Sequence, residues 1–144
     1  LTVSRENFEK FQQAFLECSQ SILTADCLQP RLRLDAEVDL DAMNFDFLDG
    51  HEMLQPFGTG NPQPLFFARG VSQIAEPRAL KEKHLRLTLR QRVRAHSAIY
   101  FNATAADLPR PPWDIAFQIE RHEYNERVSI EIAIKAIRSA TASC

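Results

Sequence analysis

Residues 84–90 read HLRLTLR, which is the clearest secondary-structure pattern in the chain. Leu85, Leu87 and Leu89 alternate with polar residues, and a period of two is typical of a strand with one buried face. We therefore expect the three leucines to pack into a core. The solvent side of the same strand would carry His84, Arg86, Thr88 and Arg90.

Four further stretches, at 65–71, 97–103, 113–120 and 127–137, alternate in the same way. In the second of these the pattern places Ile99 and Phe101 inward and Tyr100 outward. Five short strands without helices between them favour a small β-barrel or sandwich. The proline-rich segment 108–113 is expected to connect two of them, because proline supplies no backbone donor to a sheet.

The first third of the chain has different patterns. Apolar residues recur at helical spacing over about 5–23, so we expect an amphipathic helix that Ser4 can cap. Its apolar stripe contains Phe8, Phe11, Phe15, Leu16, Cys18 and Ile22. We expect Cys18 to be buried there, against a partner element that lies outside this chain.

Residues 32–40 alternate again, which predicts a half-buried strand. Its inward residues would be Leu32, Leu34, Ala36, Val38 and Leu40. A short helix should follow within 39–54, capped by Asp39 or Asp41 and turning its apolar side chains inward. These are Met43, Phe47, Leu48 and Leu54. We expect His51 at its surface.

The bulk composition is that of an ordinary globular protein of 144 residues with a net charge of −2. No apolar run is long enough to cross a membrane, so a cytoplasmic protein is expected. Three scattered cysteines argue against a disulfide framework and a zinc site. Charge is uneven: residues 1–65 carry 4 Lys and Arg against 11 Asp and Glu, whereas residues 66–144 carry 13 against 8. This change of sign indicates a domain boundary and a polyanionic partner, unless it is ordinary variation.

The change of sign falls at QPFGTGNPQPLFF, residues 55–67. Its prolines restrict φ, whereas Gly58 and Gly60 allow positive φ, so we expect a shaped connector. Phe57 and Phe66 would fix its two ends. Contact of Phe57, Gly58, Gly60 and Asn61 with a ligand stays an open alternative.

Basic residues gather on and around the strand 84–90. The set is Lys81, Lys83, His84, Arg86, Arg90 and Arg92, with Tyr100 as an exposed aromatic residue on the next strand. Cationic side chains that follow phosphates, beside a ring that stacks on a base, are typical of single-stranded nucleic acid binding. The alternative is an ordinary solvated face.

The connector also resembles a known motif. Its residues Pro56, Phe57, Gly58, Gly60, Asn61, Pro62, Pro64 and Phe66 resemble the Pro-Phe-Gly-x-Gly-Asn-Pro-x-Pro-x-Phe segment of RecJ, a family of single-stranded-DNA-specific 5′-to-3′ exonucleases. KEKHLRLTL (81–89) and AIYFNA (98–103) resemble later segments of that family, in the same order. Tyr100 departs from an expected glycine and Glu131 from an expected glutamine.

The resemblance implies an α+β chain with three parts. Residues 1–54 would be the end of a DHHA1 domain with a linker strand and helix, 55–67 the connector, and 68–144 a five-stranded antiparallel OB-fold barrel. It implies a parent enzyme whose upstream DHH domain binds Mn²⁺ or Mg²⁺ and acts in DNA repair and recombination. None of those catalytic motifs is present, so this chain is expected to have no catalytic residue, metal ligand or cofactor of its own.

The partners that the resemblance implies are single-stranded DNA and the upstream catalytic domain. An alternative role is a scaffolding module that braces the nuclease core or recruits a single-strand-binding protein.

Overall fold

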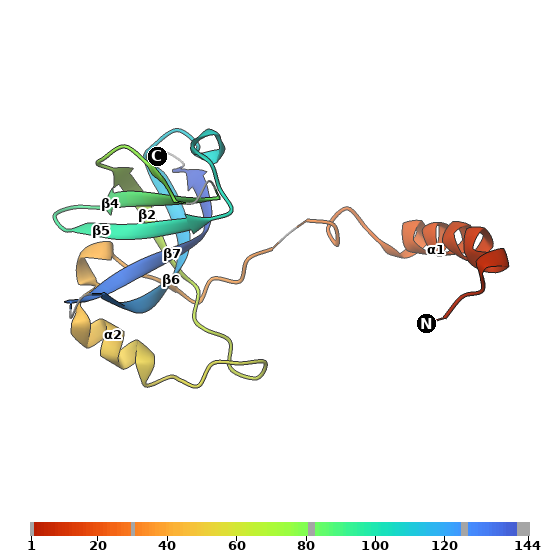
Figure 1. Cartoon of the computed structure of the whole chain (residues 1–144), viewed down its shortest axis with the longest axis horizontal. Coiled ribbons are helices and arrows are strands. Elements are labelled where there is room, and N and C mark those ends of the chain that lie inside the picture. Colours follow the sequence, from red (N-terminus) through yellow and green to blue (C-terminus); the bar gives the residue numbers. More distant parts are fainter. Residues whose placement is uncertain (1, 30, 81–82, 125–126, 141–144) are drawn as a thin grey trace. The chain divides into compact units, whose positions relative to one another are not determined.

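The computed structural model describes residues 2–29, 31–80, 83–124 and 127–140. It divides into two compact units, Leu1–Leu32 and Arg33–Cys144. The first contains a short 3₁₀ helix, η1 (Arg5–Asn7), and helix α1 (Phe8–Ile22). The second contains the sheet and helix α2 (Figure 1). The divisions expected at residues 54 and 67 stay predictions.

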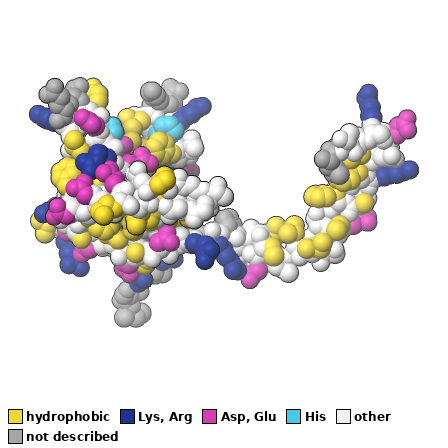
Figure 2. All heavy atoms as spheres, turned by 90° about the horizontal axis from the view of Figure 1, so that it is seen from below, with side chains coloured by type: hydrophobic (Ala, Val, Ile, Leu, Met, Phe, Trp, Pro, Cys, Tyr) yellow, Lys and Arg dark blue, Asp and Glu magenta, His cyan; other side chains and the backbone are white. Residues whose placement is uncertain are grey.

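Helix α1 forms where the sequence predicts it, although the Ser4 side chain makes no capping hydrogen bond. None of its residues is buried, and Phe8, Phe15 and Ile22 are more than half exposed. Apolar side chains are visible along this helix in Figure 2. Cys18 is exposed, because nothing within the described part of this unit covers the stripe, so its burial against an element outside this chain stays a prediction.

The second unit is built on a seven-stranded sheet. Its strands are β1 (Ala36–Glu37), β2 (Phe66–Gln73), β3 (Arg78–Leu80), β4 (His84–Arg90), β5 (Ala95–Phe101), β6 (Trp113–Tyr124) and β7 (Arg127–Ser139). Their order is β1-β2-β6-β7-β5-β4-β3. A further pairing of β2 with β4 joins Ser72 to Arg90 and Gln73 to Leu89, so five strands form a closed ring of pairs. The α+β class and the five expected strands are thus confirmed.

The expectation that the sheet is wholly antiparallel is wrong. Strand β7 runs parallel to β5, with Ala98 opposite Ile132 and Tyr100 opposite Ile134, and β1 runs parallel to β2. Parallel neighbours need a long crossover between them. Between β5 and β7 that crossover comprises the 3₁₀ helix η3 (Ala105–Asp107), the proline-rich segment and β6.

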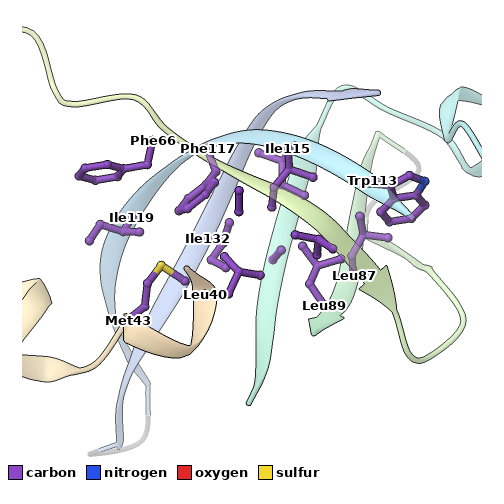
Figure 3. Packing of buried hydrophobic residues seen from close by; sticks show 14 of the residues in the cluster. Leu40, Met43, Phe66, Leu87, Leu89, Trp113, Ile115, Phe117, Ile119 and Ile132 are labelled. Carbon is purple, nitrogen blue, oxygen red and sulfur yellow. The ribbon is translucent and has the colours of Figure 1, made fainter. Parts of the chain in front are cut away.

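The core of this unit lies inside the ring of strands (Figure 3). Leu87, Phe117 and Ile132 are completely buried, and Trp113 closes one end. The indole Nε1 of Trp113 donates a hydrogen bond to the Pro109 carbonyl at 2.8 Å. Burial of these large side chains is the main stabilising contribution, at about 1.5–3 kcal/mol for each.

The predicted strand 32–40 is mostly wrong. Only Ala36 and Glu37 form a strand, at the edge of the sheet, and Leu32 and Leu34 are exposed. Leu32 and Leu34 lie outside this strand, so alternation alone does not bury them. Leu40 is fully buried, but in the 3₁₀ helix η2 (Leu40–Ala42), whose start is capped by the Asp39 side chain.

Helix α2 (Phe45–Glu52) follows, capped by Asn44, whose Oδ1 accepts from the Phe47 amide at 2.8 Å. Met43 and Leu48 are buried as expected, whereas Leu54 is half exposed. The surface position expected for His51 is wrong, since only 6% of this residue is exposed. Its ring packs between those of Phe57, at 5.2 Å, and Phe66, at 6.0 Å.

The connector 55–67 lies wholly within the second unit. Gly58 and Asn61 pair through two backbone hydrogen bonds. The side-chain amide of Asn61 also donates, through Nδ2, to the backbone carbonyls of Leu54 and Pro56. Neither connector glycine has positive φ, unlike Gly70 at 64°. A Cβ atom at Gly58 or Gly60 would meet nothing within 4 Å. Among the described helices, none is long and apolar enough to cross a membrane.

Candidate nucleic-acid interface

Strand β4 has the two faces that its sequence predicts. Leu85, Leu87 and Leu89 are buried, whereas Arg86 and Arg90 are exposed on the other face. Strand β3 extends this face, because Arg78 lies directly opposite Arg86 in the antiparallel pairing. Residues directly opposite each other in such a pair point to the same side.

The orientation expected for β5 is wrong for Tyr100 and Phe101, although Ile99 is buried as expected. Tyr100 lies opposite Leu85 and packs against the core, while Phe101 lies opposite His84 on the outward face. Phe101 is 46% exposed, and its ring meets the His84 ring edge-on at 5.1 Å. The exposed aromatic residue beside the arginines is therefore Phe101 and not Tyr100. We call Arg78, His84, Arg86, Arg90 and Phe101 the basic face.

The orientation of the His84 ring is set by the backbone. Its Nδ1 accepts a hydrogen bond from the Asn102 amide at 3.1 Å. Asn102 has φ of 52°, in the left-handed region that asparagine tolerates better than most residues. A neutral imidazole with Nδ1 as acceptor carries its proton on Nε2, so His84 has a donor for a ligand.

One carboxylate reduces the positive charge of the basic face. Glu131 on β7 approaches Arg86, with 3.5 Å between Oε1 and Nη2, and only 16% of the Glu131 side chain is exposed. Among the described residues, neither Arg78 nor Arg90 has an ion-pair partner. Two of the three arginines are thus available to a polyanion.

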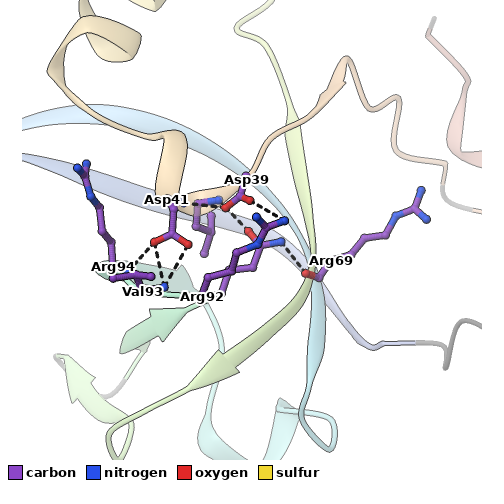
Figure 4. Close-up of polar contacts among 8 residues, drawn as sticks. Asp39, Asp41, Arg69, Arg92, Val93 and Arg94 are labelled. Atoms are coloured by element: carbon purple, nitrogen blue, oxygen red, sulfur yellow. Dashed lines mark hydrogen bonds and ion pairs between the residues drawn. The ribbon is translucent and has the colours of Figure 1, made fainter.

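The turn between β4 and β5 is held by acidic residues (Figure 4). Asp41 accepts hydrogen bonds from the backbone amides of Val93 and Arg94, which lower the pKa of its carboxyl group. Arg92 forms an ion pair with Asp39 at 3.2 Å. Arg92 thus contacts the start of η2 with a side chain that is 73% exposed, and its contact with DNA stays a prediction.

The other residues in the predicted site lie elsewhere. Lys83 is exposed just before β4, and Lys81 is outside the described residues. Phe57 and the glycine turn lie beside α2, apart from β4 and β5 (Figure 1). The structure adds Arg78 and Phe101 to the face. Both residues are placed on this face by the pairing of their strands with β4. The sequence analysis missed them because no local pattern shows which strands pair.

The described residues contain no group of three or more His, Cys, Asp or Glu side chains that could hold a metal ion. They give no site for the Mn²⁺ or Mg²⁺ that the resemblance implies for a parent enzyme.

A closed ring of five strands, with β5 and β7 parallel and a basic outer face on β4 and β5, is typical of an OB domain. The family model described as RecJ OB domain matches residues 34–136. The chain therefore belongs to the RecJ OB domain family.

Two solved structures share the fold. RecJ from Thermus thermophilus in complex with Mg²⁺ is 20% identical, with a TM-score of 0.68 over 98% of this chain. RecJ from the same organism in complex with Mn²⁺ is 23% identical, with a TM-score of 0.63 over 93% of the chain. This chain spans 21% and 20% of those two proteins, respectively. No curated protein matches the chain.

Proposed function

We propose that this chain is the C-terminal single-stranded-DNA-binding portion of a RecJ-like 5′-to-3′ exonuclease that acts in DNA repair and recombination. The observation that carries the proposal is the basic face, where His84 lies beside the exposed Phe101 ring and three arginines follow along the same side of β3 and β4. The arginines and His84 would contact phosphates, and Phe101 would stack on a base. The ring of strand pairs favours the five-stranded barrel that OB domains use for this purpose.

The proposal extends to the parent protein. Its catalysis would come from an upstream DHH domain, and it would act in the cytoplasm, where it meets single-stranded DNA. Lys83, which precedes β4, would add a phosphate contact. A contact of the Gly58–Asn61 turn with DNA would require the strand to pass beside α2. The open space around Gly58 and Gly60 would allow this approach.

Fluorescence anisotropy with a labelled oligo-dT tests the proposal at two salt concentrations. We expect affinity to fall steeply with salt, because binding releases counterions from the phosphates. The double change Arg86→Glu and Arg90→Glu should weaken binding at least tenfold. The matched control is Arg5→Glu with Arg110→Glu, which reverses two exposed charges that do not belong to the basic face. Absence of binding at low salt would refute the proposal.

A second candidate function, protein interaction, is favoured by α1. Its exposed Phe8, Phe15 and Ile22 form an apolar surface that needs a partner, which we propose is the nuclease core. The basic face could also recruit a single-strand-binding protein through an acidic peptide. Pull-down with acidic peptides tests the recruiting role, and comparison of the parent enzyme's processivity with and without residues 66–144 tests the bracing role.

A further inference from the structure

A hollow of about 510 Å³ lies where the starts of α2, β5 and β7 come together. Met43, Phe45 and Val128 form its apolar wall, and Arg94, His96 and Ser97 contribute polar groups. Its volume is within the range of roughly 300–1,000 Å³ that small-molecule sites occupy. The resemblance and the family match assign it no role.

The charge of this hollow suits an anion. Arg94 is the charged side chain in its wall, and none of the described carboxylates lines it. Asp41 binds the Arg94 backbone amide, but the Arg94 side chain extends away from Asp41 (Figure 4). By contrast, a hollow of about 470 Å³ beside β6 is lined by Glu52, Glu120 and Arg121.

His96 supplies a polar group that has no partner. Its Nε2 is buried and makes no hydrogen bond with the described residues. Burial lowers the pKa of His96, so the ring is neutral at pH 7, and because one ring nitrogen already bonds to the Leu40 backbone, Nε2 is the group left for a ligand. A buried polar atom without a partner is costly, and a ligand with a hydrogen-bonding edge would remove that cost.

The apolar wall suits a flat ring. Phe45 is the first residue of α2 and 48% exposed, and Val128 is 39% exposed. Among the described residues, no aromatic ring stacks on Phe45. An exposed aromatic ring of this kind is a stacking surface for a nucleobase.

The hollow and the basic face share strand β5. Ser97 in its wall lies opposite Thr88 on the outward side of β4, and Ala95 lies opposite Arg90. A strand that runs along β4 from His84 would therefore reach the hollow after Arg90.

We propose that this hollow holds one nucleotide of a bound single strand. The base would stack on Phe45 and Val128 with its edge toward His96, and the phosphate would lie near Arg94. This inference rests on the proposed function, because it places the hollow on the path of the same strand.

Nuclear magnetic resonance titration of the whole chain with thymidine 5′-monophosphate tests the inference. We expect shifts at Ser97, Ser129 and the His96 ring, and affinity at least fivefold weaker in Phe45→Ala and Arg94→Gln. The controls are Met53→Ala, an exposed apolar residue next to α2, and Arg110→Gln. Both should bind like the wild type. Thermal unfolding checks that each variant folds.

Two results would overturn the inference. One is a titration with thymidine 5′-monophosphate that does not shift these resonances. The other is an affinity for deoxyribose 5-phosphate equal to that for the nucleotide, which would make the hollow a phosphate site alone. Oligo-dT binding without nucleotide binding refutes this hollow but leaves the proposed function intact. Nucleotide binding without oligo-dT binding refutes the proposed function instead.

Discussion

Arg121 on β6 is joined to Glu52 on α2 by two hydrogen bonds, from Nε to Oε1 at 2.9 Å and from Nη2 to Oε2 at 2.8 Å. Nη2 also donates to Asp49 at 2.6 Å. This two-pronged geometry is the strongest form of ion pair between side chains, and lysine cannot reproduce it. It fastens α2 to the sheet.

We therefore expect Arg121→Lys to lower the midpoint of thermal unfolding at pH 7, whereas Arg110→Lys, at an exposed position, should not. Arg121 lowers the pKa of Glu52, and a carboxylate with a lowered pKa stabilises the fold above its ordinary pKa of 4.5. This stabilisation disappears as the pH falls through the folded-state value. The difference between variant and wild type should shrink below about pH 4. A difference that is independent of pH would contradict this account.

His51 should make stability depend on pH in a different range. Burial lowers its pKa below 6.5, so the unfolded chain binds the proton more readily. The contribution of neutral His51 to the free energy of unfolding is therefore complete above about pH 6.5 and is lost as the pH decreases. His51→Phe should reduce the loss of unfolding free energy between pH 7 and 5.5, measured by urea denaturation. His122→Phe, at an exposed position on β6, should keep the wild-type slope.

Phe101 should contribute more to DNA affinity than Tyr100. Removing a stacking ring costs about 1–3 kcal/mol, so Phe101→Ala should weaken oligo-dT binding roughly 5- to 150-fold. Because Phe101 is half exposed, the variant should unfold within about 1 kcal/mol of the wild type. Tyr100→Phe keeps the ring inside the core and should leave the affinity unchanged. The reverse order of effects, measured by anisotropy, would restore Tyr100 as the stacking residue.

Glu131→Gln should strengthen DNA binding. The change removes the carboxylate that pairs with Arg86 and makes that guanidinium available to phosphate. We expect a gain in affinity of about two- to fivefold, of the size of one partly exposed ion pair, and a steeper dependence on salt. Glu9→Gln on α1 changes the net charge equally and is the control. If both variants gain the same affinity for DNA, the effect comes from net charge, and the prediction that Glu131 restrains Arg86 is wrong.

The five strands could be predicted because each has a strong period of two. Strand β5 shows the limit of this reasoning, since all of Ile99, Tyr100 and Phe101 are large and none is charged. The pairing with β4 decides its orientation, and pairing depends on residues far apart in the sequence. Strand 32–40 fails for the opposite reason: its pattern is perfect, but only two of its residues reach the sheet.

The candidate site was predicted in part. His84, Arg86 and Arg90 share one face because they share one strand, which is local information. Arg78 joins them through β3, a strand of three residues that is too short to show a period. Arg92 pairs with Asp39, 53 positions earlier, a contact that no local pattern shows, and its expected contact with DNA stays a prediction. His51 is buried because Phe57 and Phe66 return across it from the connector.

The pairing of β2 with β4 has a consequence for local unfolding. Only two residue pairs close the ring there, whereas seven join β4 to β5 and twelve join β6 to β7. Thermal fluctuations should separate this seam without disturbing the rest of the sheet. Backbone amides at Ser72 and Gln73 should then exchange with deuterium long before those in the middle of β6. A ring that opens at one edge could widen around a ligand while its core stays packed.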